Sequence, residues 1–193
     1  SLTAAGLAAV VAGTAAVAVA LLATRHPGRL ARLVERLSYS GYALPGIVVA
    51  LALVFFGTRV AVPLYQTLAM LVFALAVLFL PLAIGATRAA LLQVSPRVEE
   101  AARGLGRRPL GVLATVTAPL AASGVLAGAA LVLLTALKEL PATLILSPIG
   151  FDTLATRIWH ETSVGFYERA AFPSLALLLV SAVPLYVLSA RDG

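Results

Sequence analysis

Acidic and basic side chains gather in one short segment, residues 95–109, between stretches that are almost entirely Ala, Leu and Val. Ser95 is suited to cap a helix and Pro96 to occupy its first position. Glu99 and Glu100 follow in the first turn, where the helix dipole favours negative charge. An apolar stripe recurs at helical spacing, formed by Val98, Ala101, Ala102 and Leu105. This charged segment is predicted to form an amphipathic helix of about two or three turns, and its chemistry is that of recognition.

Two kinds of surface could receive such a helix: lipid headgroups or a groove on a protein partner. The stripe is built largely from the small residues Ala101 and Ala102, without Trp or Phe to enter lipid, and anionic headgroups would repel the glutamates. These features favour a protein groove. Glu99 and Arg103 are spaced i, i+4 and are expected to pair on the solvent side. Gly104 and Gly106 weaken the helix and are expected to end it.

Composition limits the classes of protein to which the chain can belong. Of the 193 residues, 61% are hydrophobic and 11% charged, and the mean hydropathy is +1.03. A soluble domain is about half apolar and about a quarter charged, so lipid is the expected solvent. Cysteine is absent, and His26 and His160 lie far apart, so no metal site is predicted. The net charge of +6 comes without aromatic platforms, which disfavours nucleic-acid binding.

Five uncharged stretches are long enough to cross a bilayer, which takes about 20 apolar residues. They are residues 2–24, 38–58, 60–87, 110–137 and 170–190. We therefore predict an all-α, multi-pass membrane fold with five spans. Small residues such as Gly124 and Gly128 are typical of helices that pack closely in lipid. Residues 140–151 are too short to cross and contain two prolines, which predicts a re-entrant or interfacial segment.

The distribution of Lys and Arg predicts the orientation. With five spans, ten of these residues fall on the side of the charged segment and four on the other. The positive-inside rule then places the N-terminus outside the cell and the charged segment and C-terminus in the cytoplasm.

The spacing within the charged segment is similar to the cytoplasmic coupling motif of binding-protein-dependent ABC importer permeases. Glu100, Ala101 and Ala102 are followed by three residues and then Gly106; nine further residues lead to Val116, Thr117, Ala118 and Pro119. The departures from the family pattern are Val116 for Ile and Ala118 for Leu, both mild. The resemblance covers the whole chain and implies the five-span fold.

The resemblance implies that this loop docks into a groove on a cytoplasmic ATPase. Glu100, Ala101, Ala102 and Gly106 would form the docking motif, with Gly106 as a tight turn and Pro119 at the start of the fourth span. ATP would be bound by the partner, since the chain has no phosphate-binding Gly-rich loop of its own and is not expected to be an enzyme.

The outer segment, residues 138–169, carries the charges that flank the predicted path. Lys138, Glu139, Pro141 and Asp152 are candidate translocation-path or periplasmic contacts. Alternatively, Lys138 and Glu139 form a local ion pair. Trp159 is expected to be an interfacial anchor and His160 a surface residue. Residues 139–143 and 150–155 resemble the ferric-iron subgroup of these permeases, which implies iron as substrate; sulfate, thiamine, polyamine and phosphonate permeases remain alternatives.

Together these patterns predict one permease module over residues 1–193 in a bacterial inner membrane. Its expected partners are an ATPase dimer, a second permease module, an extracytoplasmic substrate-binding protein and membrane lipid. The initial Ser indicates a fragment, such as the second half of a fused permease. A stand-alone channel or secondary transporter would place charges inside its spans, and an intramembrane enzyme would place catalytic pairs there. The five stretches contain neither.

Overall fold

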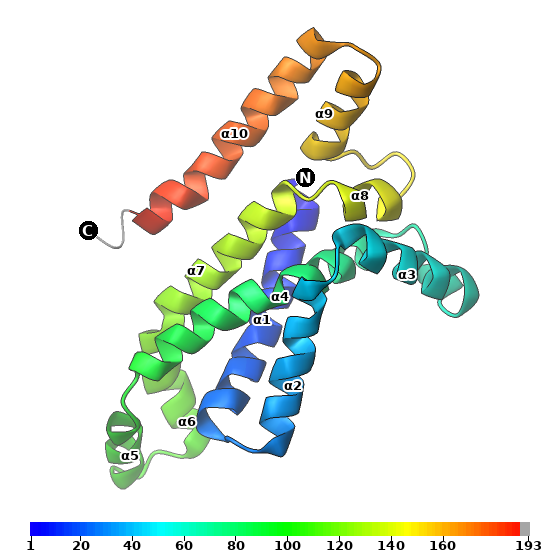
Figure 1. The fold of residues 1–193 in the computed structure, drawn as a ribbon. Helices are drawn as coiled ribbons and strands as arrows, with labels where there is room; N and C mark the ends of the chain where they lie inside the picture. The colour runs from blue at the N-terminus through cyan, green and yellow to red at the C-terminus, as the bar shows by residue number, and fades with distance from the viewer. Residues whose placement is uncertain (190–193) are drawn as a thin grey trace.

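The computed structural model describes residues 1–189, which form helices joined by short loops (Figure 1). No strand occurs in this range, so the predicted all-α fold is confirmed. In chain order the elements are α1 (Leu2–Arg25), α2 (Arg29–Ser40), η1 (Gly41–Ala43), α3 (Gly46–Arg59), η2 (Val62–Leu64), α4 (Leu68–Gln93), α5 (Pro96–Gly104), α6 (Pro109–Val112), η3 (Leu113–Thr117), α7 (Ala118–Leu137), α8 (Pro141–Leu146), α9 (Leu154–Ser163) and α10 (Tyr167–Ser189).

Helices α1, α4 and α7 pack lengthwise against one another and form the core (Figure 1). Alanine makes this close packing possible, because α1 buries a row of alanines spaced four residues apart: Ala4, Ala8, Ala12, Ala16 and Ala20. In lipid, such small residues let helix backbones approach and gain dispersion contacts. The larger side chains that fill the centre come mainly from α4, including Leu71, Leu75 and Ile84.

Gly124 and Gly128 are the points of closest approach between α7 and α4. A Cβ atom at Gly128 would lie 3.0 Å from both the Cα and the carbonyl oxygen of Ala83. One at Gly124 would lie 2.8 Å from the carbonyl oxygen of Ala86 and would also collide with the Cβ of Ala90. These neighbouring atoms belong to the backbone or to the Cβ of an alanine and cannot rotate away, so the two helices would have to separate.

Replacing Gly124 by alanine is therefore expected to destabilise the protein by about 1–3 kcal/mol, despite alanine's better helix propensity. Thermal unfolding of the purified protein in detergent measures the change. Gly6→Ala in α1 is the matched control, because nothing lies within 4 Å of the added Cβ. An equal or higher melting temperature for Gly124→Ala than for Gly6→Ala would contradict close packing at this position.

The second predicted span, residues 38–58, is not one helix. The chain forms α2 and η1, then turns by 106° into α3, which has 14 residues. Pro45 explains the break: proline disfavours helical geometry in the residue before it, and Leu44 is extended, with φ −94° and ψ 135°. Most of the predicted loop before this span is the amphipathic helix α2.

The third predicted span, residues 60–87, begins and ends too early. Residues 60–67 form a turn that contains Pro63 and the positive φ of Gln66, and α4 begins only at Leu68. The helix then continues past Thr87 to Gln93, because Arg88 is a good helix former; its side chain pairs with Glu35. Ending the predicted span at the first charged residue therefore placed its end six residues before the end of the helix.

Among the described residues, three helices are long and apolar enough to cross a membrane: α1, α4 and the continuous run Pro109–Leu137. The bent pair of α2–η1 and α3 would make a fourth if it crosses as one unit. The predicted fifth span corresponds to α10, which is 23 residues long. Ala190, the end of that prediction, and Arg191, which entered the charge count, lie outside the described residues.

The two ends of the bundle are formed by different elements (Figure 1). Helices α5 and α6 and the turn between α1 and α2 lie at one end, whereas α8, α9 and the N-terminus lie at the other. At the latter end, the backbone N–H of Leu154 donates a hydrogen bond to Ser1 Oγ at 2.6 Å. The charged segment and the outer segment are therefore on opposite ends of the fold.

Candidate coupling site

The predicted helix in the charged segment is α5, with Ser95 at its N-cap and Pro96 at its first position. Ser95 makes no side-chain capping bond, so that part of the prediction is wrong. Of the two glutamates predicted for the first turn, only Glu99 lies in it, and it is 5% exposed, whereas Glu100 is exposed. The two acidic residues therefore have different surroundings and require separate explanations.

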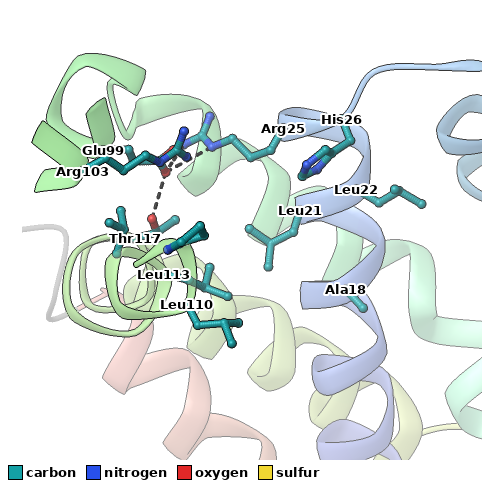
Figure 2. Close-up of a pocket in the computed structure, with 12 residues that line it drawn as sticks. Ala18, Leu21, Leu22, Arg25, His26, Glu99, Arg103, Leu110, Leu113 and Thr117 are labelled. Carbon is teal, nitrogen blue, oxygen red and sulfur yellow. Dashed lines mark hydrogen bonds and ion pairs between the residues drawn. The ribbon is translucent and has the colours of Figure 1, made fainter. Parts of the chain in front are cut away.

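Glu99 does not face solvent as predicted but points into the protein (Figure 2). Its Oε1 accepts hydrogen bonds from Arg25 Nε at 3.1 Å and from the Thr117 hydroxyl at 2.8 Å. The expected partner, Arg103, is more distant, at 3.9 Å from Oε2, and is exposed. We call Glu99, Arg25 and Thr117 the Glu99 anchor.

Arg25 also connects this anchor to α4. It is the last residue of α1, and its Nη2 also donates to the carbonyl oxygens of Leu91 at 3.3 Å and Val94 at 3.1 Å. These carbonyls lie at the C-terminal end of α4, where backbone acceptors lack helical partners and the dipole favours a cation. Removal of one member of such a buried ion pair typically costs about 3–5 kcal/mol.

The turn after α5 depends on Gly106, which has a φ of +83°. The N–H of Arg107 donates to the carbonyl of Ala102 at 3.3 Å, and the N–H of Gly106 donates to that of Arg103 at 2.9 Å. This pair of bonds is the Schellman arrangement, which favours glycine at its left-handed position. The prediction of a tight turn at Gly106 therefore matches the observed geometry, while Gly104 is the last helical residue of α5.

The apolar stripe of α5 faces outward. Val98 is 48% exposed and Leu105 is 86% exposed. Ala101 is exposed as well, and Ala102 is partly buried. Glu100, Ala101, Ala102 and Gly106 thus lie together on one short helix and its turn, with a free apolar surface beside them.

Pro119 lies elsewhere, in the first turn of α7. The preceding π-helical turn η3 widens the helix just before this proline, and the run Pro109–Leu137 remains continuous. A proline ring clashes with the carbonyl four residues earlier, and a π turn relieves that crowding. Pro119 therefore marks a change of helix geometry within the span rather than its beginning.

A cleft of about 550 Å³ lies between the end of α1 and the α5–α6 region (Figure 2). Its polar lining comes from Arg25, His26, Glu99 and Arg103, and its apolar lining from residues such as Leu21 and Leu113. The cleft therefore adjoins the Glu99 anchor.

At the opposite end, the structure brings only some of the predicted contacts together. Glu139 is partly buried; its Oε1 accepts from the N–H of Ala142 at 3.2 Å and would lie 2.5 Å from a Cβ at Gly46. Pro141 is the first residue of α8, directly after this turn. Lys138 is exposed at the end of α7. Asp152 is exposed in the loop before α9.

The ion pairs of the described residues do not include one between Lys138 and Glu139, so that alternative is not seen. Trp159 on α9 is 52% exposed and His160 is also exposed, as expected for an anchor and a surface residue.

Sequence reasoning missed Arg25, Thr117 and a second ion pair, Arg88 with Glu35, at 2.7 Å. The partners are 74, 18 and 53 positions apart, respectively, so no helical periodicity links them. Only two features of the sequence pointed to these contacts. Arg25 directly follows an apolar span, and Glu99 is an additional acidic residue next to Glu100, the one glutamate of the coupling motif.

Apolar helices of spanning length, with a charged helix and turn at one end, define the chain as a multi-pass membrane protein. Residues 10–190 match the family described as the inner membrane component of binding-protein-dependent transport systems. The chain therefore belongs to this family of ABC importer permeases, which are transport subunits rather than enzymes and work with an ATPase and a substrate-binding protein.

Two curated relatives share this region. The chain is 38% identical over 183 residues, 95% of its length, to the Fe(3+)-transport system permease protein FbpB 2 of Haemophilus influenzae. It is 38% identical over 125 residues, 64% of its length, to a probable molybdenum ABC transporter permease protein of Haloferax volcanii. It spans 36% of the first protein and 45% of the second.

Among solved structures, the fold is similar to a chain of the MetNI methionine ABC transporter in an inward-facing conformation. The TM-score is 0.77 at 18% identity, and the match covers 98% of this chain and 90% of that one. At this identity the similarity shows the fold alone.

Proposed function

We propose that this chain forms part of the translocation path of an ATP-driven importer and that its charged segment docks into the cytoplasmic ATPase. The observation that carries the proposal is the exposed apolar face of α5, from Val98 to Leu105, followed by the left-handed turn at Gly106. A short amphipathic helix that presents small and apolar residues fits a groove on a partner protein. Glu100, Ala101, Ala102 and Gly106 form the proposed contact.

The proposed orientation places this end of the molecule in the cytoplasm. The α1–α2 turn, flanked by Arg25 and Arg29, lies at the same end as α5, which carries Arg97 and Arg103 (Figure 1). Positive charge retained on one side supports the positive-inside assignment. The N-terminus, with α8 and α9, would then be periplasmic.

A second permease module, fused or separate, would complete the path, and an ATPase dimer would bind the two loops. ATP would shift the pair between inward-facing and outward-facing states through its differential affinity for them. Lys138, Glu139, Pro141 and Asp152 are the proposed periplasmic or path contacts. Of these, Glu139 is the best placed to be structural, because it caps the start of α8 beside α3.

Ferric iron is the proposed substrate. The support is the match to an Fe(3+)-transport permease over 95% of the chain, together with the iron-type sequences at residues 139–143 and 150–155. Molybdenum is the second candidate, because the other relative is a probable molybdenum permease that matches 64% of the chain.

Uptake by the protein, reconstituted in vesicles with its ATPase and binding protein, tests this proposal. We expect accumulation of radioactive ferric iron that requires ATP and is unaffected by excess molybdate. Uptake of molybdate instead of iron would assign the second candidate. Iron entry that proceeds equally without ATP would contradict the importer proposal and favour a channel or secondary transporter.

A further inference from the structure

Glu99 and Glu100 are adjacent in sequence, yet only Glu100 is available to a partner. The Glu99 carboxylate is enclosed by groups from α1 and η3, which are far from it in the chain. A buried carboxylate is stable only where cations and hydrogen-bond donors satisfy it. Glu99 therefore joins α5 to α1 and η3 through its side chain.

The hydroxyl of Thr117 is used differently from those of other helical threonines. Most threonine hydroxyls in the long helices and in η3 donate to the carbonyl four residues earlier in their own helix, as seen for Thr14, Thr24, Thr58, Thr115 and Thr135. Thr117, at the end of the π turn, donates instead to Glu99. This hydrogen bond ties α5 to the base of α7.

The regular helical backbone is interrupted on either side of α5. Val94 and Ser95 are extended, with ψ of 109° and 127°, and the helix ends at the left-handed Gly106. The turn at Gly106 is held by backbone bonds to α5 itself, from the N–H groups of Gly106 and Arg107, and the Glu99 side chain adds contacts to the spans. With it, α5 is fixed to α1, to the end of α4 through Arg25, and to η3.

We propose that Glu99 is a positioning residue that makes the docking helix move as one body with α1, α4 and α7. The inference rests on the proposed docking and adds that binding and transmission use different residues. The exposed face of α5 holds the ATPase, and the buried face passes its movement to the spans through Arg25 and Thr117. Loss of the anchor would leave the ATPase bound but its motion absorbed by the loop.

Thr117→Val tests this role, because it keeps the shape of the side chain and removes only the hydroxyl. In the reconstituted full-length transporter, ATPase affinity, ATP hydrolysis and iron taken up per ATP are each measured. We expect the affinity to stay unchanged and the uptake per ATP to fall about tenfold, the population shift that follows loss of a hydrogen bond to a charged group.

Two variants control for packing. Thr117→Ser restores the hydroxyl and should restore the uptake per ATP, whereas a purely structural role would leave Ser and Val alike. Thr14→Val removes an exposed hydroxyl that bonds to carbonyls of its own helix, α1, away from the docking loop, and should behave as wild type. Glu99→Gln, which leaves the Thr117 hydroxyl intact, repeats the test if Thr117→Val fails to assemble.

The outcomes separate this inference from the proposed function. A wild-type protein that captures no ATPase would overturn the docking on which both depend. A wild-type protein that couples well, together with Thr117→Val and Glu99→Gln variants that couple equally well, would overturn only the role of Glu99. Equal loss of ATPase affinity and uptake per ATP in both variants would also overturn it, because Glu99 would then act in binding.

Discussion

Replacement of Leu105 by aspartate is expected to weaken capture of the ATPase about 100-fold. Leu105 is 86% exposed, so the change should not disturb folding of the chain. Burial of a leucine side chain in a groove contributes about 1.5–3 kcal/mol, and a carboxylate in its place adds a desolvation penalty. Titration of the purified full-length protein with its ATPase measures the affinity.

Ile149→Asp provides the matched control for this prediction. Ile149 is 88% exposed, similar to Leu105, but lies between α8 and α9 at the opposite end of the bundle (Figure 1). Its replacement should leave the ATPase affinity at the wild-type value. Equal weakening by both substitutions would show that the affinity responds to general disturbance of the protein and not to the face of α5.

Replacement of Gly106 by valine is expected to reduce the ATPase affinity about tenfold or more. A β-branched residue is strongly disfavoured at the φ of +83° found here, and strain of this kind costs about 1–3 kcal/mol. The chain relieves the strain by changing the turn, which misplaces α5 relative to its groove. The same titration detects the change.

Gly104→Ala tests the addition of a side chain to α5 at a position without backbone strain. Neither glycine has any atom within 4 Å of an added Cβ, and the two differ in that Gly104 is helical while Gly106 is left-handed. Alanine at position 104 should preserve the affinity or improve it slightly, because it favours the helix. Weakening by Gly104→Ala that matches Gly106→Val would contradict the role assigned to the turn.

The features predicted well from the sequence are those set by local chemistry. The signals of Pro96 and Gly106 predicted the start of α5 and the turn after it, because each of these residues acts on its own backbone. Gly124 and Gly128 predicted close helix packing, because a residue without a side chain leaves room for a neighbouring helix backbone. The all-α membrane class followed from composition alone.

The features predicted poorly depend on contacts between distant residues or on competition between signals. The uncharged stretch 38–58 was predicted to be one span, but the chain turns by 106° at Pro45, because an uninterrupted hydrophobic stretch is not necessarily a straight helix. Helical spacing predicted the ion pair of Glu99 with Arg103, which forms at 3.9 Å, but not the shorter contacts with Arg25 and Thr117 that bury the carboxylate. Arg88 lies inside α4 and pairs with Glu35, 53 positions earlier. Only the packed structure brings these partners together.

The most direct test of the account is a cross-link from the face of α5 to the ATPase. The chain contains no cysteine, so Ala101→Cys introduces a single reactive thiol into it, and Ser163→Cys does the same at the exposed end of α9. With a short thiol-directed photo-cross-linker on the assembled transporter, the account predicts a covalent product with the ATPase from position 101 and none from position 163. A product from position 163 without one from position 101 would contradict both the docking surface and the orientation.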